Sequence, residues 1–156
     1  IGDWEADTII GTNHRGAVVS LVERKTGYAK LIRVPSKEAA GVTQAINKAL
    51  RPFKEMVLTI TFDNGKEFAG HEKIAKVLKA DCYFADPYSS WQRGSNENLN
   101  GLVRQYFPKK STDFTQVTDA EIAEVERKLN NRPRKRLGWK TPAQVFSGKS
   151  LNLLTY

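Results

Sequence analysis

The sequence predicts an α/β fold in which a mixed five-stranded sheet, with three antiparallel strands followed by two parallel ones, is flanked by helices. Three short runs of alternating or β-branched apolar residues open the chain, and turn residues separate them, which predicts an antiparallel meander. Two further apolar runs lie between segments of helical periodicity, which predicts crossover connections and parallel pairing. The expected order is three strands, helix, strand, helix, strand and helix.

The meander is expected at residues 4–11, 17–23 and 29–34. The alternation of its first strand places three acids on one face: Asp3, Glu5 and Asp7. Three carboxylates on one strand face are unfavourable unless water or cations surround them. This face is therefore a candidate for a functional site.

The middle of the chain predicts a helix, a strand, a second helix and a second strand. Residues 37–50 carry apolar side chains at helical spacing, and Pro52 is expected to end that helix. The run 57–62 is apolar without sharp alternation, which predicts a central strand covered on both faces. A helix with Ile74 and Leu78 on its buried side leads to the last strand, at 82–85.

The last third of the chain predicts three helices. Residues 95–107 return to helical periodicity, and Thr118 with Glu121 has the form of a capping box before the next helix. Thr141 and Pro142 suit the N-cap and first position of a short helix at 143–146. The final residues have no clear assignment.

Composition indicates a single domain with a polyanionic partner. The 156 residues are enough for one core, and the net charge of +8 with a pI near 9.6 favours nucleic acid, although many basic proteins bind none. The single cysteine, Cys82, lies in an apolar run and is expected to be buried in a reducing compartment. The sequence contains no run of about 18 apolar residues and therefore predicts no membrane span. A cytoplasmic, nucleoid-associated protein without membrane contact is expected.

Asp63 follows the apolar strand directly, at the carboxyl edge of the sheet, where α/β folds place their ligands. The sequence Asp63-Asn64-Gly65 is also a turn signal by itself. Glu97, which follows Asp63 after 33 intervening residues, is equally ambiguous because an acid in the first turn of a helix is favoured by the macrodipole. Its helix face is unusual, since Asn100, Gly101 and Arg104 continue it with small and polar residues.

Asp7, Asp63 and Glu97 would repel one another by several kcal/mol at an effective dielectric near 20 if they met in a partly shielded site. Divalent cations would relieve that repulsion. Carboxylate oxygens favour Mg²⁺, with Mn²⁺ as a substitute, and the two histidines are too far apart in sequence to suggest zinc. Two such ions could activate water or a 3′-hydroxyl for phosphodiester attack, with no nucleophilic side chain.

Basic residues near these acids are candidates for DNA contact through phosphate neutralisation. They lie beside Asp63, around Glu97 and in the densest basic segment, 128–140: Lys66, Arg93, Arg104, Lys109, Arg134, Lys135 and Arg136. A solvated basic loop would explain that last segment almost as well. Trp91 and Trp139 either stack on unpaired bases or wedge their loops onto the core.

The chain resembles the catalytic core of bacterial insertion-sequence-30 transposases, the DDE class related to retroviral integrases. The resemblance rests on GDWEADTIIG, LVERKTGYAKL, TFDNGKEF, PYSSWQRGSNENLNGLVRQYFPK and RPRKRLGWKTPAQVF, which span nearly the whole chain. It implies a ribonuclease-H-like fold and assigns the catalytic, metal-binding acids to Asp7, Asp63 and Glu97, with Asp3 as the reserve for Asp7. It also implies one catalytic domain, 1–156, as a fragment without the amino-terminal DNA-binding region.

The resemblance further implies Mg²⁺-dependent cleavage at transposon ends, strand transfer of the 3′-hydroxyl into target DNA, and a homo-oligomer on DNA. A ribonuclease-H-like nuclease without strand transfer is the alternative enzyme. A DNA-binding or interaction module whose acids are structural is the alternative of another class.

Overall fold

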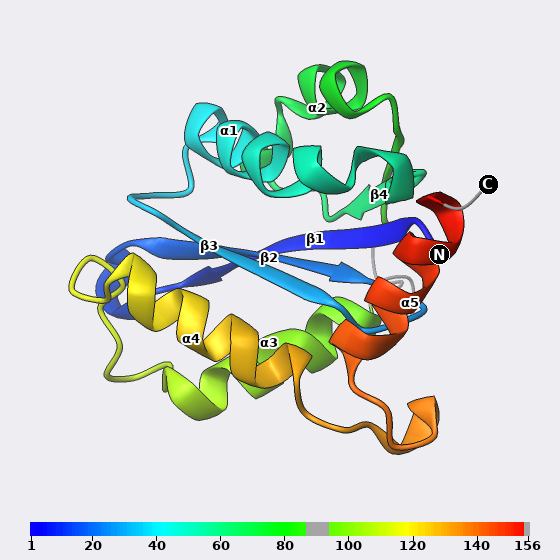
Figure 1. Ribbon diagram of the computed structural model, residues 1–156. Coiled ribbons are helices and arrows are strands. Elements are labelled where there is room, and N and C mark those ends of the chain that lie inside the picture. The colour runs from blue at the N-terminus through cyan, green and yellow to red at the C-terminus, as the bar shows by residue number, and fades with distance from the viewer. Residues whose placement is uncertain (87–93, 155–156) are drawn as a thin grey trace.

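The computed structural model describes residues 1–86 and 94–154, with side chains as far as residue 148. Its centre is a five-stranded sheet in the order β3-β2-β1-β4-β5 (Figure 1). Strand β1 (Asp3–Ile10) pairs antiparallel with β2 (Ala17–Glu23), which pairs antiparallel with β3 (Ala29–Val34). On its other side β1 pairs parallel with β4 (Thr59–Phe62), which pairs parallel with β5 (Asp81–Phe84). The predicted α/β class and the predicted strand directions are confirmed.

The helices form a layer on each face of this sheet (Figure 1). One layer holds α1 (Ala39–Leu50) and α2 (His71–Leu78), and the other holds α3 (Gly94–Tyr106) and α4 (Asp119–Asn130). Helix α5 (Pro142–Leu154) lies at the end of the sheet near the N-terminus. Short 3₁₀ turns link these elements: η1 (Thr12–His14), η2 (Arg51–Met56), η3 (Lys66–Phe68) and η5 (Lys135–Leu137).

Each face of the sheet has its own apolar core. The core under α1 and α2 includes Trp4, Ile46 and Phe62, and Phe146 of α5 closes it by stacking on Tyr28 with ring centroids 4.3 Å apart. The second core lies under α3 and α4 and contains Val18, Leu99, Val103, Phe114 and Leu129. Residues of β1 therefore alternate between the two faces: Trp4 and Ala6 enter the first core, and Ile9 enters the second.

Two predictions about the middle of the chain were wrong in part. Strand β4 is not covered on both faces, because Ile60 and Phe62 are buried while Thr59 and Thr61 are only half-buried. Helices α3 and α4 cover β1, β2 and β3, so β1 is the central strand. The predicted end of the first helix is confirmed, because α1 ends at Leu50 and Pro52 lies in the first turn of the separate 3₁₀ segment η2. Cys82 is half-buried rather than buried, and burial raises the pKa of its thiol to about 11.

The helix ends follow the predicted capping chemistry. The hydroxyl of Thr118 accepts a hydrogen bond from the Glu121 backbone N–H, and the Glu121 carboxylate accepts one from the Thr118 backbone N–H. Thr141 and Gln144 form the same reciprocal pair before α5, which runs eight residues beyond the predicted stop at 146. Within the described ranges, no helix combines the length and apolarity that crossing a membrane requires.

Candidate active site

Asp7 and Asp63 lie level with each other on neighbouring parallel strands. The register pairs Asp3 with Thr59 and Ala6 with Phe62, and the same offset brings Asp63 level with Asp7 one step further. Neighbouring strands are about 4.8 Å apart, so the two backbones are held at close range where β4 ends and β1 continues toward Ile10. This register agrees with the convergence predicted for the strands of Asp7 and Asp63, and the approach of Glu97 stays a prediction.

The Asp63 turn confirms the turn interpretation of the sequence Asp63-Asn64-Gly65 and leaves the role of Asp63 in the site a prediction. One carboxylate oxygen of Asp63 accepts a hydrogen bond from the Gly65 backbone N–H at 2.8 Å, which is ordinary turn chemistry. The Asn64 amide donates to the carbonyl of Ala85 at 3.1 Å and ties the turn to the end of β5. The turn is thus fixed on β5 as well as β4, and Asp63 has little freedom to move.

Glu67 anchors the same segment to β1 and was not singled out by the sequence. Its side chain is buried, accepts a hydrogen bond from the Thr8 hydroxyl at 3.2 Å and pairs with Lys37 Nζ at 3.3 Å. A Cβ at Gly65 would lie 2.5 Å from the Glu67 carboxylate, so the glycine leaves room for this contact. The segment after Asp63 is therefore packed tightly beside the residue that follows Asp7.

Helix α3 meets the sheet through polar side chains next to Asp7. The Asn100 amide donates to Asp7 Oδ2 at 3.0 Å and accepts from the Ser20 hydroxyl at 2.8 Å, and Ser20 is the cross-strand partner of Asp7. One turn earlier, Asn96 is fully buried and its amide donates to Ser20. Through these contacts α3 holds the Asp7 side chain, and the same contacts fix the position of α3 on the sheet.

Glu97 is exposed in the first turn of α3, three residues before Asn100 and so on the same side of the helix. Among the side chains placed by the structure, no three acids, histidines or cysteines come close enough to hold a metal ion together. The joint role of Asp7, Asp63 and Glu97 as metal ligands therefore remains a prediction, as does their catalytic role.

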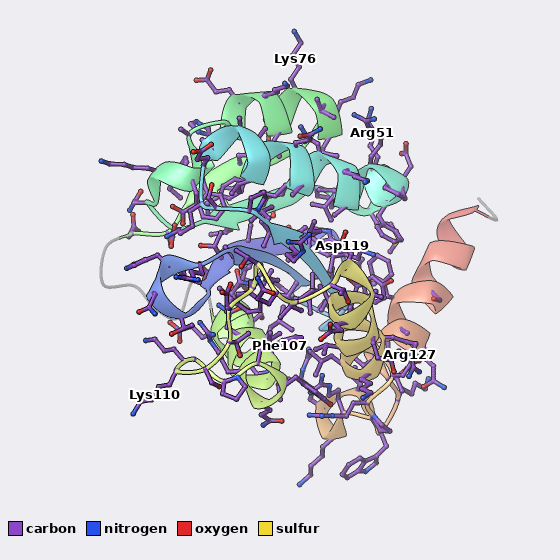
Figure 2. The ribbon with its side chains drawn as sticks, turned by 90° about the vertical axis from the view of Figure 1, so that its left-hand side faces the viewer. Arg51, Lys76, Phe107, Lys110, Asp119 and Arg127 are labelled. Carbon is purple, nitrogen blue, oxygen red and sulfur yellow. The ribbon has the colours of Figure 1, made fainter. Side chains whose placement is uncertain are left out.

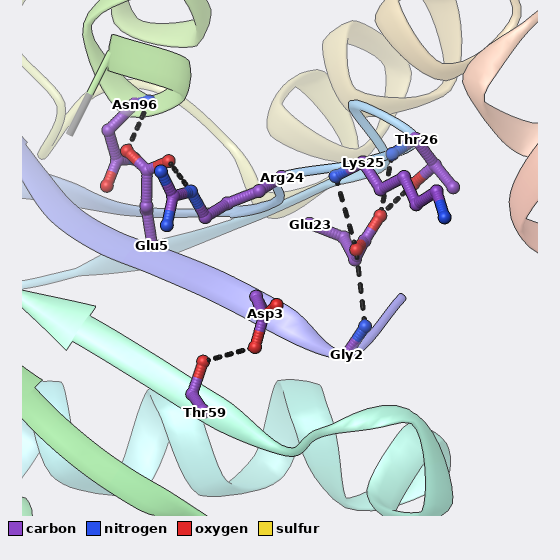
Figure 3. A network of polar contacts seen from close by, with 9 residues as sticks. All are labelled: Gly2, Asp3, Glu5, Glu23, Arg24, Lys25, Thr26, Thr59 and Asn96. Carbon is purple, nitrogen blue, oxygen red and sulfur yellow. Dashed lines mark hydrogen bonds and ion pairs between the residues drawn. The ribbon is translucent and has the colours of Figure 1, made fainter. Parts of the chain in front are cut away.

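Asp3 and Glu5 share the strand face of Asp7 but make contacts of other kinds. Asp3 accepts from the Thr59 hydroxyl at 2.7 Å, four residues back along both strands from the Asp7 and Asp63 level. Glu5 is completely buried, and Arg24 Nε lies 3.1 Å from its Oε2 as an ion pair, although no hydrogen bond reaches that oxygen (Figure 3). Between the two residues that sequence periodicity left open, the register favours Asp7 over Asp3.

The predicted DNA-contacting residues fall into two groups. Lys66, Lys109 and Lys135 are exposed, whereas three arginines spend part of their donor capacity on backbone carbonyls. The arginine contacts are Arg104 to Ile10, Arg134 to Leu129 and Arg136 to Lys25. Burial lowers the pKa of both Arg104 and Arg134 below the ordinary guanidinium value. Arg93 and Trp91 lie outside the described residues, and Trp139 is 67% exposed.

A groove of about 860 Å³ runs from Asn100 along the turn between β1 and β2. Arg104, Lys109 and Lys110 line one side of it, and Thr12 to His14 line the other. The Thr12 N–H donates to the carbonyl of Thr112 at 2.7 Å, which ties the two sides together at one end. The groove joins the Asp7 region to a row of basic side chains.

Solved structures show which fold class this arrangement belongs to. The catalytic core domain of BIV integrase superimposes with a TM-score of 0.71 at 22% identity, covering 98% of each chain. An intasome structure of simian T-cell lymphotropic virus, in complex with a PP2A regulatory subunit, gives a TM-score of 0.73 at 17% identity, over 91% of this chain and 52% of that one. The chain therefore has the ribonuclease-H-like fold of integrase catalytic cores.

Sequence relatives of the chain are transposases of insertion sequence elements. The chain is 52% identical over 145 residues to the transposase for insertion sequence element IS4351 of Bacteroides fragilis. It is 43% identical over 147 residues to the transposase InsI for IS30A of Escherichia coli (strain K12), and 39% identical over 150 residues to the transposase for IS1086 of Cupriavidus metallidurans. These matches cover 93% to 94% of this chain but only 38% to 44% of the relatives. No protein-family model matches. Over this segment the chain is homologous to insertion-sequence-30 transposases, which confirms the resemblance.

Proposed function

We propose that the chain is the catalytic core of a DNA transposase that cleaves phosphodiesters at transposon ends and transfers the 3′-hydroxyl into target DNA. The observation that carries this proposal is the register that brings Asp63 level with Asp7, with Asn100 of α3 bonded to Asp7. The sequence relatives are named as transposases, which supports DNA as the substrate.

The acids near this edge suit a hard divalent cation. Asp7 offers carboxylate oxygens from within β1 and Asp63 from the end of β4, and Glu97 lies on the adjoining helix as the third donor. Bound Mg²⁺ would supply the activation of a water or 3′-hydroxyl and the stabilisation of the leaving oxygen. The protein would hold Asp7 in place through Asn100 and Asp63 through its turn, so that only Glu97 must approach for binding.

The DNA would follow the groove beside Asn100. Lys109 and Lys110 are exposed on its wall and would neutralise phosphates, while Arg104 stiffens the wall through its bond to Ile10. Lys66 beside Asp63 and Lys135 in η5 would extend this contact. A homo-oligomer on DNA belongs to the proposal, because each transposon has two ends and each core has one set of acids.

The proposal is tested with Asp63→Asn and Glu97→Gln in the natural full-length protein, using labelled transposon-end DNA and Mg²⁺ or Mn²⁺. We expect cleavage and strand transfer to fall by at least roughly 100-fold for each, because a charged ligand at the reacting phosphate is lost. DNA affinity without metal should stay near the original value.

Asp81→Asn is the matched control, since Asp81 is an exposed acid at the opposite end of the parallel strands. Full activity of Glu97→Gln would overturn the assignment of the third acid. Cleaved ends that never join to target DNA would instead identify a nuclease. If the two substitutions weaken folding without changing metal-dependent cleavage, the chain is a binding module whose acids are structural.

A further inference from the structure

Glu5 is a fully buried carboxylate that reaches from the central strand to the start of α3. Its Oε1 accepts a hydrogen bond from the Asn96 backbone N–H at 3.1 Å, and its Oε2 faces Arg24 Nε at 3.1 Å (Figure 3). Asn96 is the third residue of α3, and its N–H is one of the first-turn donors that have no partner within the helix. Glu5 therefore caps α3 from another element of the fold.

Burial of this charge demands a reason beyond packing. A buried carboxylate is unfavourable unless a partner and hydrogen bonds compensate it, and an apolar residue of similar volume is often at least as stable. Arg24 supplies the countercharge while its own side chain stays 46% exposed. The positive end of the helix dipole adds to this, because the carboxylate lies at the first turn of α3.

A second buried glutamate in the same sheet shows what a purely local role looks like. Glu23 is equally inaccessible, and its carboxylate accepts from the N–H groups of Gly2, Lys25 and Thr26 (Figure 3). Those contacts close the hairpin between β2 and β3 and fasten Gly2, the residue before β1. They reach no helix, whereas Glu5 contacts the residue immediately before Glu97.

We propose that Glu5 is a positioning residue, which sets where α3 begins and thereby where Glu97 stands relative to Asp7 and Asp63. The inference rests on the proposed function. Asn96 is held twice, by Glu5 at its backbone and by Ser20 at its side chain, so the first turn cannot slide along the sheet while both contacts persist. Glu5 lies two residues before Asp7 on the same strand face, so one strand fixes both acids.

The direct test measures amide hydrogen exchange at Asn96 by NMR in the wild-type chain, Glu5→Gln and Glu5→Met. The Gln side chain keeps an acceptor for the Asn96 N–H, whereas Met matches the volume without one. We expect protection at Asn96 to fall roughly tenfold or more in Glu5→Met and to be retained in Glu5→Gln. Should Glu5→Met not fold, Glu5→Asp, which keeps the charge but shortens the reach, should lose part of the protection. Unchanged protection in the Met or Asp variant would refute the capping role.

The functional arm measures cleavage by the natural full-length protein as a function of Mg²⁺ concentration. Glu5→Met should raise the Mg²⁺ concentration for half-maximal cleavage by about 10-fold or more. In Glu5→Gln that concentration should stay close to the wild-type value, and DNA affinity should be unchanged in both variants. Glu23→Met is the matched control and should lower stability without moving the Mg²⁺ dependence. Equal shifts in both Met variants would overturn the positioning role. If the wild-type protein shows no metal-dependent cleavage, the proposed function fails, and the exchange measurement still decides whether Glu5 holds α3.

Discussion

At the scale of single residues, Asn100 links the helix layer to the proposed chemistry. Its amide spans Asp7 and Ser20, which face each other across β1 and β2. The Asn100 amide donates to Asp7 Oδ2, and the Thr8 backbone N–H donates to Asp7 Oδ1 at 2.8 Å, so the carboxylate is held in one orientation. Partners of this kind, one step removed from the reacting group, are usually important to activity.

Asn100→Ala should therefore reduce metal-dependent cleavage by about 10- to 100-fold, with unchanged DNA affinity. The measurement is single-turnover cleavage of transposon-end DNA at saturating Mg²⁺. Asn98→Ala provides the control, because it removes an exposed asparagine amide from another side of the same helix. Equal activity of Asn100→Ala and the wild-type protein would contradict a role for this bond.

The residues of the site differ in how far the sequence predicts them. Asp63 directly follows a recognisable strand, so the sequence alone places it at the carboxyl edge of the sheet. Asp7 lies within the first strand, and only the register of that strand with β4 brings the two acids level. The bond from Asn100 to Asp7 and the burial of Glu5 depend on how α3 docks, which no local pattern encodes. Sequence periodicity treats Asp3, Glu5 and Asp7 as equivalent, and only the neighbouring strand and helix distinguish them.

At the scale of elements, helix starts are the best predicted features. The Thr118 and Glu121 pair at α4 has the reciprocal hydrogen bonds that the sequence indicates. The boundaries of α5 are less well predicted, because Phe146 docks this helix on a core formed by distant residues. Tertiary packing, rather than local preference, decides these boundaries.

Thr118→Ala should lower the free energy of unfolding by about 1 kcal/mol, because the Glu121 N–H loses its capping acceptor. Urea denaturation followed by circular dichroism would measure the change. Thr118→Ser retains the hydroxyl and should remain within about 0.5 kcal/mol of the wild-type value. A Ser variant as unstable as the Ala variant would show that the threonine methyl, not the cap, is responsible.

At the scale of the whole molecule, basic residues occur on both helix layers, and the structure separates their surroundings. Lys110 lies on the α3 side and Lys76 on the opposite layer (Figure 2). Only the first side adjoins the groove that leads to Asn100. The net charge of +8 could not make this distinction, because a net charge does not say where on the molecule the basic residues lie.

Replacing Lys109 and Lys110 together by Gln should weaken DNA binding and reduce the slope of log affinity against log salt by about 2, close to 0.9 for each lost phosphate contact. Fluorescence anisotropy at several salt concentrations would give the slope. The double variant Lys73→Gln and Lys76→Gln removes the same charge from the α2 layer. An identical change of slope in both double variants would mean that charge alone, and not the groove, binds the DNA.

The parallel pairing of β1 with β4 also restricts how this site can change. Trp4 and Ala6 fill one core while Asp7 faces the other layer, so a one-residue deletion between Trp4 and Asp7 would turn the carboxylate into the apolar side. A two-residue change would restore the face but move Asp7 out of level with Asp63. Substitutions in this part of the chain are therefore compatible with the site, whereas insertions and deletions are not. The number of residues between Trp4 and Asp7 is constrained as strongly as the side-chain contacts are.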